Sequence, residues 1–431
     1  MEGQCRSILP FFELSKALAL KGIRVSLIST PRNLQRLPPI PQELAPQINL
    51  VGFPLPLVEG LPKNAKATIE NISLEKVQYL KKAYDGLRAP FEELVAKVSP
   101  DWILVDFAPY WAPAIAFKYG IPCCFFIVFS AACCAFGGAP ESLNGVNERK
   151  KVEDFTVVPG WIPFPSTIAF RPHEVHKIFQ DASFDIPNAS GVSDGYRFGS
   201  TIEGCRVVAV RTCNEFEEGY LDLLEKLYEK SVIPIGFRPP ARKEREGSGN
   251  SWNDENKWDI AFHWLDAQPL RSVVFVGFGS GALEVQDGSG ILSEGFESRT
   301  EGRGIVCIGW APQQSIVAHP SIGGCLFHSG WGSIIEALTH GLALIILPFI
   351  ADQGLNARLL EEKKLAFEVE RNENDGSFTK ISIAKALRLA MVEEEGEPLR
   401  IKAREMNPIF GNRELSNMYL DGFANFLKDN K

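Results

Sequence analysis

Polar motifs that follow apolar runs in the C-terminal half contain residue types suited to binding a nucleotide that carries a diphosphate. Trp310 and Gln313 form the first motif, and an aromatic plane beside an amide can stack on a base and hydrogen-bond to its edge. In the second motif, His328 and Ser333 lie at the start of a predicted helix, whose free backbone amides attract anions. Ser333 is also a favoured N-cap residue. The motifs predict a base site and a diphosphate site within one stretch.

Acidic and amide side chains complete the same stretch. Glu336 lies one helical turn after Ser333, where its carboxylate could accept hydrogen bonds from ribose hydroxyls. Asp352 and Gln353 place a carboxylate next to an amide, which suits adjacent sugar hydroxyls and requires no metal. Each residue alone is more often a core or helix-start residue, so only the combination predicts a ligand. The stretch lacks the lysine of a P-loop and the pattern GxGxxG, so neither ATP nor NAD is favoured.

The elements that must position these motifs are buried parallel strands, because ligands of open α/β sheets bind beyond the carboxyl ends of the strands. Near-continuous apolar runs at 272–278, 305–308, 324–327 and 342–347 are typical of such strands. Helical patterns follow, which we predict to cover 333–340, 355–364 and 383–394.

The N-terminal half shows the same alternation. Phe11, Leu14 and Leu18 share one helical face, and Gly22 follows as a residue that ends helices. Strands then alternate with helices, which implies a second parallel sheet with helices on both faces. The predicted strands cover 23–30, 102–106, 121–129, 205–211 and 232–235, and the predicted helices cover 89–97 and 112–118.

The length of 431 residues exceeds what one hydrophobic core normally supports, so we expect two domains. The segment 238–257 is rich in proline, glycine, serine and charge, and we predict that it is a linker. Doubly wound domains are therefore expected at 1–237 and 258–410. The final segment, 411–431, contains an amphipathic helix that we expect to dock back on the N-terminal domain.

Composition excludes several classes of function. A formal net charge of -8 argues against a nucleic-acid surface, which needs a basic patch. The nine cysteines show no metal-ligand spacing and are expected to be small buried hydrophobes in a reducing compartment. The N-terminus lacks a signal-peptide pattern, and the most apolar stretch, 123–139, is short for a membrane span. We therefore expect a cytoplasmic protein with no membrane span and no nucleic-acid partner.

The stretch 310–353, WAPQQSIVAHPSIGGCLFHSGWGSIIEALTHGLALIILPFIADQ, resembles without a gap the signature box of plant UDP-dependent secondary-product glycosyltransferases, the family 1 enzymes. The similarity extends over nearly the whole chain, including STPRN at 29–33, PDWILVDFAP at 100–109 and VVFVGFGS at 273–280. Ser329, where the family usually has cysteine, and the run DQGLNARLLEEKK resemble one branch. Members of that branch extend sugars on flavonoid or terpenoid glycosides and are often labelled UDP-rhamnose:rhamnosyltransferases.

This resemblance implies the GT-B fold, in which two Rossmann-like domains face a cleft, with acceptor on the N-terminal domain and UDP-sugar on the C-terminal one. The implied reaction transfers a hexosyl group, glucose or rhamnose, from UDP-sugar to a hydroxyl of a small hydrophobic plant metabolite or its glycoside, with inversion. UDP-glucose or UDP-rhamnose is then a co-substrate, and no cofactor or metal is expected. We also expect a monomer.

The resemblance assigns the donor contacts position by position. Trp310 would stack on uracil and Gln313 would hold the uridine, while Glu336 would hold the ribose. His328, Ser333 and Ser280 would contact the diphosphate, and Asp352 and Gln353 the sugar. The full set of expected donor-binding residues is Ser280, Trp310, Ala311, Gln313, His328, Gly330, Trp331, Ser333, Glu336, Asp352 and Gln353.

The expected catalytic pair is a histidine acting as general base and an aspartate that orients it. Asp106, at the end of a predicted strand, matches the aspartate, and Ser7 stands where the histidine is expected. No histidine precedes His173. A second interpretation of Asp106 is a strand-end carboxylate that caps the next helix.

Other departures concern whole elements. The segment 1–7 is short and polar where a first strand is expected, and 281–303 lacks a sustained helical period. We therefore expect the fold to lack the first N-terminal strand and one βα unit of the C-terminal domain. Gly332 replaces the usual asparagine or serine.

These departures leave several functions open. The chain is a truncated version of an active transferase, a degenerate homologue that binds UDP-sugar or acceptor without efficient turnover, or a transferase in which Asp106 acts directly as base.

Overall fold

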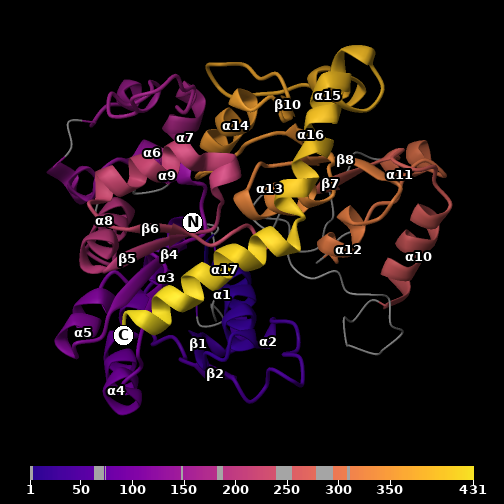
Figure 1. Cartoon of the computed structure of the whole chain (residues 1–431). Coiled ribbons are helices and arrows are strands. Elements are labelled where there is room, and N and C mark those ends of the chain that lie inside the picture. The colour runs from indigo at the N-terminus through magenta and orange to yellow at the C-terminus, as the bar shows by residue number, and fades with distance from the viewer. Residues whose placement is uncertain are drawn as a thin grey trace.

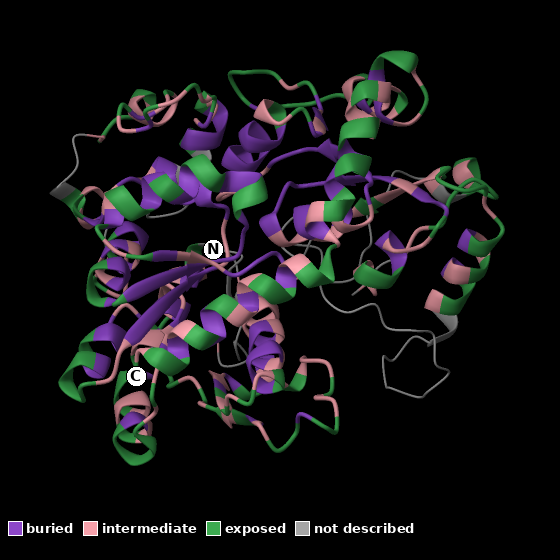
Figure 2. Ribbon diagram, in the orientation of Figure 1, coloured by how far each residue is buried: buried purple, intermediate pink, exposed green. Residues whose placement is uncertain are grey.

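The computed structural model describes residues 3–62, 72, 74–146, 149–181, 188–238, 255–277, 295–307 and 311–431. Two α/β units with parallel strands lie side by side, the N-terminal one drawn in indigo to magenta and the C-terminal one in orange to yellow (Figure 1). The central strands of both units are buried and are drawn in purple in Figure 2. This is the two-domain α/β architecture that the alternating pattern predicts.

The larger N-terminal sheet has four parallel strands in the order β3-β4-β5-β6. Every residue of β4 and β5 is buried, which explains their continuous apolar sequences. The helix predicted at 112–118 is confirmed as α5. The strands are β3 (Ile103–Val105), β4 (Cys123–Ile127), β5 (Val207–Val210) and β6 (Val232–Pro234), and the helices that contact them include α5 (Ala112–Lys118), α8 (Asp194–Gly204) and α9 (Asn214–Tyr228).

A separate two-stranded sheet precedes these strands, formed by β1 (Val25–Ser29) and β2 (Ile48–Gly52). It follows α1 (Gly3–Leu20), which ends before Gly22 at a φ of 76°. In the doubly wound order a strand before α1 would lie between β1 and β3. Among the described residues no strand precedes α1 and β1 does not pair with β3, so the sheet is interrupted where the first strand is expected.

The C-terminal sheet has the order β10-β9-β8-β7, and all its strands are parallel. Its inner strand β9 is fully buried, whereas β7 lies at an edge and leaves Val276 48% exposed. The strands are β7 (Val273–Gly277), β8 (Ile322–Phe327), β9 (Ala343–Ile346) and β10 (Ala366–Glu368), and the helices of this unit include α13 (Trp331–Thr339), α14 (Gln353–Glu362), α15 (Lys380–Met391) and α16 (Glu397–Phe410).

The strand predicted at 305–308 is wrong for its described residues, because 305–307 belong to no strand. Ile305 is 38% exposed, so the burial on both faces that stabilises a parallel strand is missing. No strand occurs between β7 and β8 in the described part of this crossover, which contains the short helices α11 (Phe296–Thr300) and α12 (Gln313–Val317). Residues 278–294 and 308–310 lie outside the described residues.

Most of the predicted linker, 239–254, also lies outside the described residues. The helix α10 (Glu255–Asp266) begins within the predicted range, so residues 255–257 are helical. The remaining described elements are α2 (Pro31–Gln35), η1 (Leu74–Lys76), α3 (Val77–Asp85), α4 (Arg88–Val98), α6 (Ala131–Gly137), η2 (Ser142–Val146), η3 (Val152–Phe155), α7 (Pro172–Asp181), α12 (Gln313–Val317) and η4 (Glu394–Gly396).

The last helix, α17 (Arg413–Asp429), leaves the C-terminal unit and crosses to the N-terminal one (Figure 1). Its Leu420 and Phe423 belong to one buried cluster with Leu14 of α1 and Phe126 of β4. The indole N–H of Trp102 donates to the carbonyl of Leu427 at 2.8 Å. The end of the chain is thereby attached to the N-terminal sheet.

Two negative findings concern the described residues alone. None of their helices combines the length and apolarity that crossing a bilayer requires. They also contain no cluster of three or more histidine, cysteine, aspartate or glutamate side chains placed to hold a metal ion. Of the eight cysteines whose side chains the structure describes, six are buried.

Candidate donor and acceptor site

Three of the predicted donor residues meet at the first turns of α12 and α13. The amide nitrogen of Gln313 donates to Glu336 Oε2 at 2.8 Å and to Ser333 Oγ at 3.4 Å. Burial raises the pKa of the Glu336 carboxyl, although the hydrogen bond from Gln313 and the charge of Arg211 oppose this shift. A half-buried carboxylate and amide near the end of a parallel strand can both hydrogen-bond to a polar ligand.

The helix α13 begins at Trp331 with Gly330 as its N-cap, so the prediction that Ser333 caps this helix is wrong. The reason is the preceding turn: Ser329 adopts a left-handed φ of 59°, and Gly330 is already extended. Ser333 therefore lies inside the first turn. No side chain caps the amides of this turn, so they can still bind an anion.

His328 follows β8 directly and is 3% exposed, at the entrance to this turn. The hydroxyl of Ser329 donates to the carbonyl of Gln353 at 2.8 Å. The turn after β8 is therefore attached to the turn after β9, which brings the predicted diphosphate and sugar motifs together.

The sugar motif differs in its two halves. The amide oxygen of Gln353 accepts from the backbone amides of Phe349 and Ile350 at 2.8 and 3.1 Å, and the residue is 1% exposed. Gln353 therefore shapes its own loop. Asp352 is half-buried, and its Oδ2 accepts from Asn356 Nδ2 at 2.7 Å.

Asn356 was not predicted, although it connects several parts of the site. Its amide nitrogen donates to the carbonyl of Ser329 at 3.1 Å as well as to Asp352. Its amide oxygen accepts from Ser130 Oγ of the N-terminal unit at 2.8 Å. Its position four residues after Asp352, on one helical face, was the available signal.

Trp331 lies at the contact between the two units. Its indole N–H donates to the carbonyl of Arg211 at 3.0 Å, and its ring lies 6.1 Å from Phe216 and 6.0 Å from Phe237. The structure thus joins its indole to the N-terminal unit, and not to the group of Gln313, Ser333 and Glu336. Ala311 and Gly330 lie in the loops beside that group, whereas Ser280 and Trp310 lie outside the described residues.

On the N-terminal side, Asp106 follows β3 and its Oδ1 accepts from the amide of Ala108 at 2.8 Å. Burial raises the pKa of this carboxyl to about 6, against the opposing effect of that hydrogen bond. No side chain caps α5, so the interpretation of Asp106 as a cap of the next helix is wrong. Ser7 lies within α1, and its side chain falls outside the described part.

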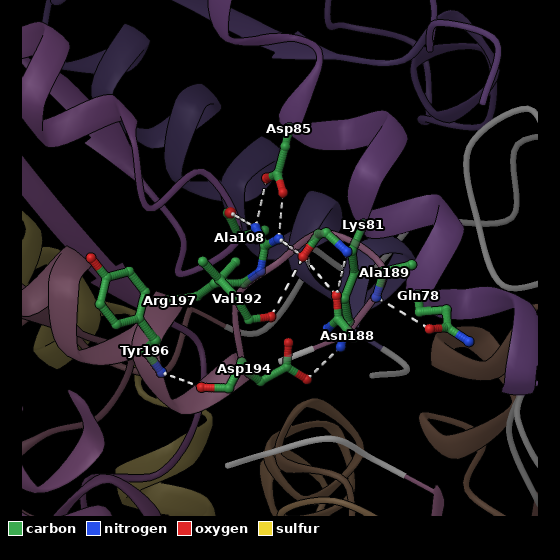
Figure 3. A network of polar contacts seen from close by, with 12 residues as sticks. Gln78, Lys81, Asp85, Ala108, Asn188, Ala189, Val192, Asp194, Tyr196 and Arg197 are labelled. Atoms are coloured by element: carbon green, nitrogen blue, oxygen red, sulfur yellow. Dashed lines mark hydrogen bonds and ion pairs between the residues drawn. The ribbon is translucent and has the colours of Figure 1, made fainter. Parts of the chain in front are cut away.

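A polar network holds the turn that carries Asp106 (Figure 3). Arg197, 2% exposed, donates to the carbonyl of Ala108 at 2.9 Å and to both carboxylate oxygens of Asp85. Lys81 Nζ donates to Asp194 Oδ2 at 2.7 Å in the same network. Helices α3 and α8 are therefore joined to the carboxyl end of β3, and sequence patterns did not reveal this long-range pairing.

Comparisons with known proteins agree with this arrangement. A family model described as UDP-glucoronosyl and UDP-glucosyl transferase matches residues 294–395. UDP-glycosyltransferase 91C1 of Arabidopsis thaliana is 42% identical over 98% of this chain and 94% of its own length. Soyasaponin III rhamnosyltransferase of Glycine max is 37% identical over 98% and 93%.

Solved structures show the same fold. A crystal structure of UGT73P12 from Glycyrrhiza uralensis, complexed with glycyrrhetinic acid 3-O-monoglucuronide, superposes with a TM-score of 0.76 at 18% identity over 99% of this chain and 94% of that one. UGT71G1 of Medicago truncatula, complexed with UDP-glucose, gives 0.71 at 20% identity over 96% and 94%. The fold is accordingly GT-B, with two Rossmann-like domains.

Proposed function

The chain belongs to the plant family 1 UDP-glycosyltransferases, and from this we propose that it transfers a hexosyl group, glucose or rhamnose, to a hydroxyl of a small plant metabolite or its glycoside, with inversion. Enzymes of this family transfer a glycosyl group from a UDP-sugar. The similarity to a soyasaponin rhamnosyltransferase supports a glycoside as acceptor. We further propose that UDP-sugar is the co-substrate without a metal, and that the protein is a cytoplasmic monomer.

The observation that carries this proposal is the group of Gln313, Ser333 and Glu336 beside the uncapped first turn of α13. A carboxylate and an amide suit the ribose and the base, and helix amides suit the diphosphate. His328 and Asp352 adjoin this group through the turns after β8 and β9. Trp310 would add base stacking, and Ser280 a hydroxyl to the diphosphate.

Asp106 is the proposed catalytic carboxylate on the acceptor side. A pKa of about 6 lets it accept a proton near neutral pH. Because position 7 carries no histidine, we propose that Asp106 itself acts as the general base and accepts the proton of the acceptor hydroxyl.

The second candidate function is binding of UDP-sugar or acceptor without efficient turnover. The observation that favours it is the interrupted N-terminal sheet together with serine at position 7. General base catalysis contributes roughly 10²–10⁴-fold, so its loss would slow transfer while the donor site stays intact.

Equilibrium binding of UDP-glucose and UDP-rhamnose, followed by assay of UDP release with flavonoid and triterpenoid glycosides, separates these functions. Acceptor-dependent UDP release that Asp106→Asn abolishes supports the transferase. Tight donor binding with no UDP release above background would establish the binding function. Absence of any UDP binding would contradict the transferase and the binding of UDP-sugar.

A further inference from the structure

Arg211 lies directly after β5, at the carboxyl end of the N-terminal sheet, and is 6% exposed. Its Nε donates to the carbonyl of Phe237 at 2.8 Å, and its Nη2 approaches the carbonyl of Arg238 at 3.4 Å. These contacts hold the guanidinium in one orientation. Its backbone carbonyl meanwhile accepts from Trp331, the first residue of α13.

The third guanidinium nitrogen borders the first turn of α13. A Cβ atom added at Gly332 would lie 3.8 Å from Arg211 Nη1. Burial lowers the pKa of Arg211 to about 10, so the side chain stays protonated at neutral pH. A cation from the N-terminal domain therefore lies beside the helix start at which we place the diphosphate.

No described carboxylate forms an ion pair with this cation. The carboxylates that raise its pKa are Glu336 and Glu13, and neither lies within ion-pair distance of it. Glu336 accepts a hydrogen bond from Gln313, and Glu13 pairs with Lys16 at 2.8 Å. A buried charge without a close counterion is costly, which indicates that an anion completes the site.

Arg238 adds a second cation to the same place. Its Nε and Nη1 are buried without a hydrogen-bond partner among the described residues. Burial lowers the pKa of Arg238 as well. The Arg238 carbonyl accepts from Arg211 Nη2, and the charge of Arg238 acts on Arg211, so this second cation with unused donors lies near the first.

We propose that Arg211, assisted by Arg238, binds the diphosphate of the nucleotide sugar from the N-terminal domain, opposite the first turn of α13. This inference rests on the proposed donor site and adds to it residues from the other domain. Guanidinium groups form short, charge-assisted hydrogen bonds to phosphate oxygens. Gly332 carries no side chain between Arg211 Nη1 and the first turn of α13.

Calorimetric titration of the full chain with UDP, uridine and pyrophosphate tests this role. Arg211→Gln is expected to weaken the affinity for UDP and for pyrophosphate about 10- to 100-fold, because charged hydrogen bonds are lost, and to leave the affinity for uridine unchanged. The matched control is Arg206→Gln. Arg206 lies just before the same strand, where its guanidinium donates to the carbonyl of Asn430 at 2.9 Å, and its loss should change none of the three affinities.

Further variants separate binding from a structural role. Arg211→Lys keeps the charge and should retain more UDP affinity than Arg211→Gln, whereas a structural role predicts equal losses. Arg238→Gln leaves the Phe237 contact intact and should weaken UDP binding even if Arg211→Gln folds poorly. Unchanged UDP and pyrophosphate affinity in the arginine variants would overturn the inference while leaving the donor site in place. Binding of pyrophosphate through Arg211 without any binding of UDP would instead overturn the proposed function alone.

Discussion

At the scale of single residues, Asp106 shows how position sets chemistry. The carboxylate ends an apolar strand, so burial disfavours its charged form, and only the amide of Ala108 opposes this effect. The result is an acid that titrates near pH 6 instead of near 4. Arg197 holds the carbonyl of Ala108 and thereby stabilises the turn.

This shift makes folding stability depend on pH. Because burial raises the folded-state pKa of Asp106, the protonated carboxyl stabilises the fold relative to the ionised one. This stabilisation is fully present below about pH 4 and is lost as pH rises through about 6. Asp106→Asn keeps an oxygen for the Ala108 amide but cannot ionise. We therefore expect the variant to be more stable than the wild type at pH 7.5, by up to about 3 kcal/mol, with the difference shrinking towards pH 4.5.

Urea unfolding at several pH values measures this difference. Asp101→Asn is a suitable control, because that carboxylate is exposed and its partner is Lys431 at the surface. A constant difference between Asp106→Asn and the wild type across the pH range would contradict the assignment.

At the scale of elements, the interrupted N-terminal sheet is the main departure from a doubly wound domain. β4 and β5 are buried throughout, whereas β1 buries only Leu27 and β3 leaves Leu104 half-buried. At the carboxyl end of β1, Thr30 Oγ1 and Asn33 Oδ1 are buried without a described hydrogen-bond partner. The strands that would flank a first strand therefore behave as edges.

A strand supplied ahead of α1 should stabilise the N-terminal domain. We expect a fused extension of five apolar β-branched residues and a short turn to pair with β1 and β3, since a parallel strand there restores the doubly wound order. Burial of the side chains minus their ordering cost gives a gain of roughly 2 to 4 kcal/mol. Urea unfolding and amide exchange in β1 and β3 measure it.

The control extension has the same length and carries proline at alternate positions, which cannot donate to a strand ladder. Equal stability of the two fusions would show that the flanking strands do not accept a partner.

At the scale of the whole molecule, polar and aromatic contacts join the two domains directly. Phe237 stacks on Phe410 at 3.9 Å between ring centroids, and Phe216 lies 4.9 Å from Phe410. Glu362 of α14 accepts from Ser166 Oγ at 2.7 Å and from Tyr220 Oη at 3.2 Å. The donor and acceptor sides are thus held in one arrangement by residues far apart in the sequence.

Removal of the Glu362 carboxylate should weaken this contact. We expect Glu362→Ala to lower the free energy of unfolding by about 1–3 kcal/mol, because Ser166 and Tyr220 lose their acceptor. The adjacent Glu361 is exposed and its carboxylate pairs with Arg358 on its own helix, so Glu361→Ala should cost less than about 0.5 kcal/mol. Equal effects in chemical denaturation would contradict a specific role for Glu362.

The C-terminal helix provides the second attachment. Phe423 is fully buried between α17 and the N-terminal sheet, whereas Met418 on the same helix is 57% exposed. Phe423→Ala should cost about 3–5 kcal/mol of unfolding free energy, and Met418→Ala less than about 0.5. Thermal unfolding compares them, and a small effect of Phe423→Ala would show that the docked helix contributes little.

The sequence by itself determined the elements and the family, because both depend on local patterns. Continuous apolar runs predicted β4, β5, β8 and β9, whose residues are largely buried on both faces, and the motif from Trp310 to Gln353 indicated the family. The run at 305–308 misled the prediction, since apolar sequence forms a parallel strand only where neighbours cover it.

Only the tertiary structure decided which side chains meet across the domains. Arg211, just after β5, lies beside the start of α13, Asn356 of α14 bonds to Ser130, and Arg197 reaches the Asp106 turn from α8. Such contacts join residues separated by a large part of the chain, and no local pattern contains them. The register of buried strands and the packing of helices upon them place these charges, and hence set their partners and their pKa values.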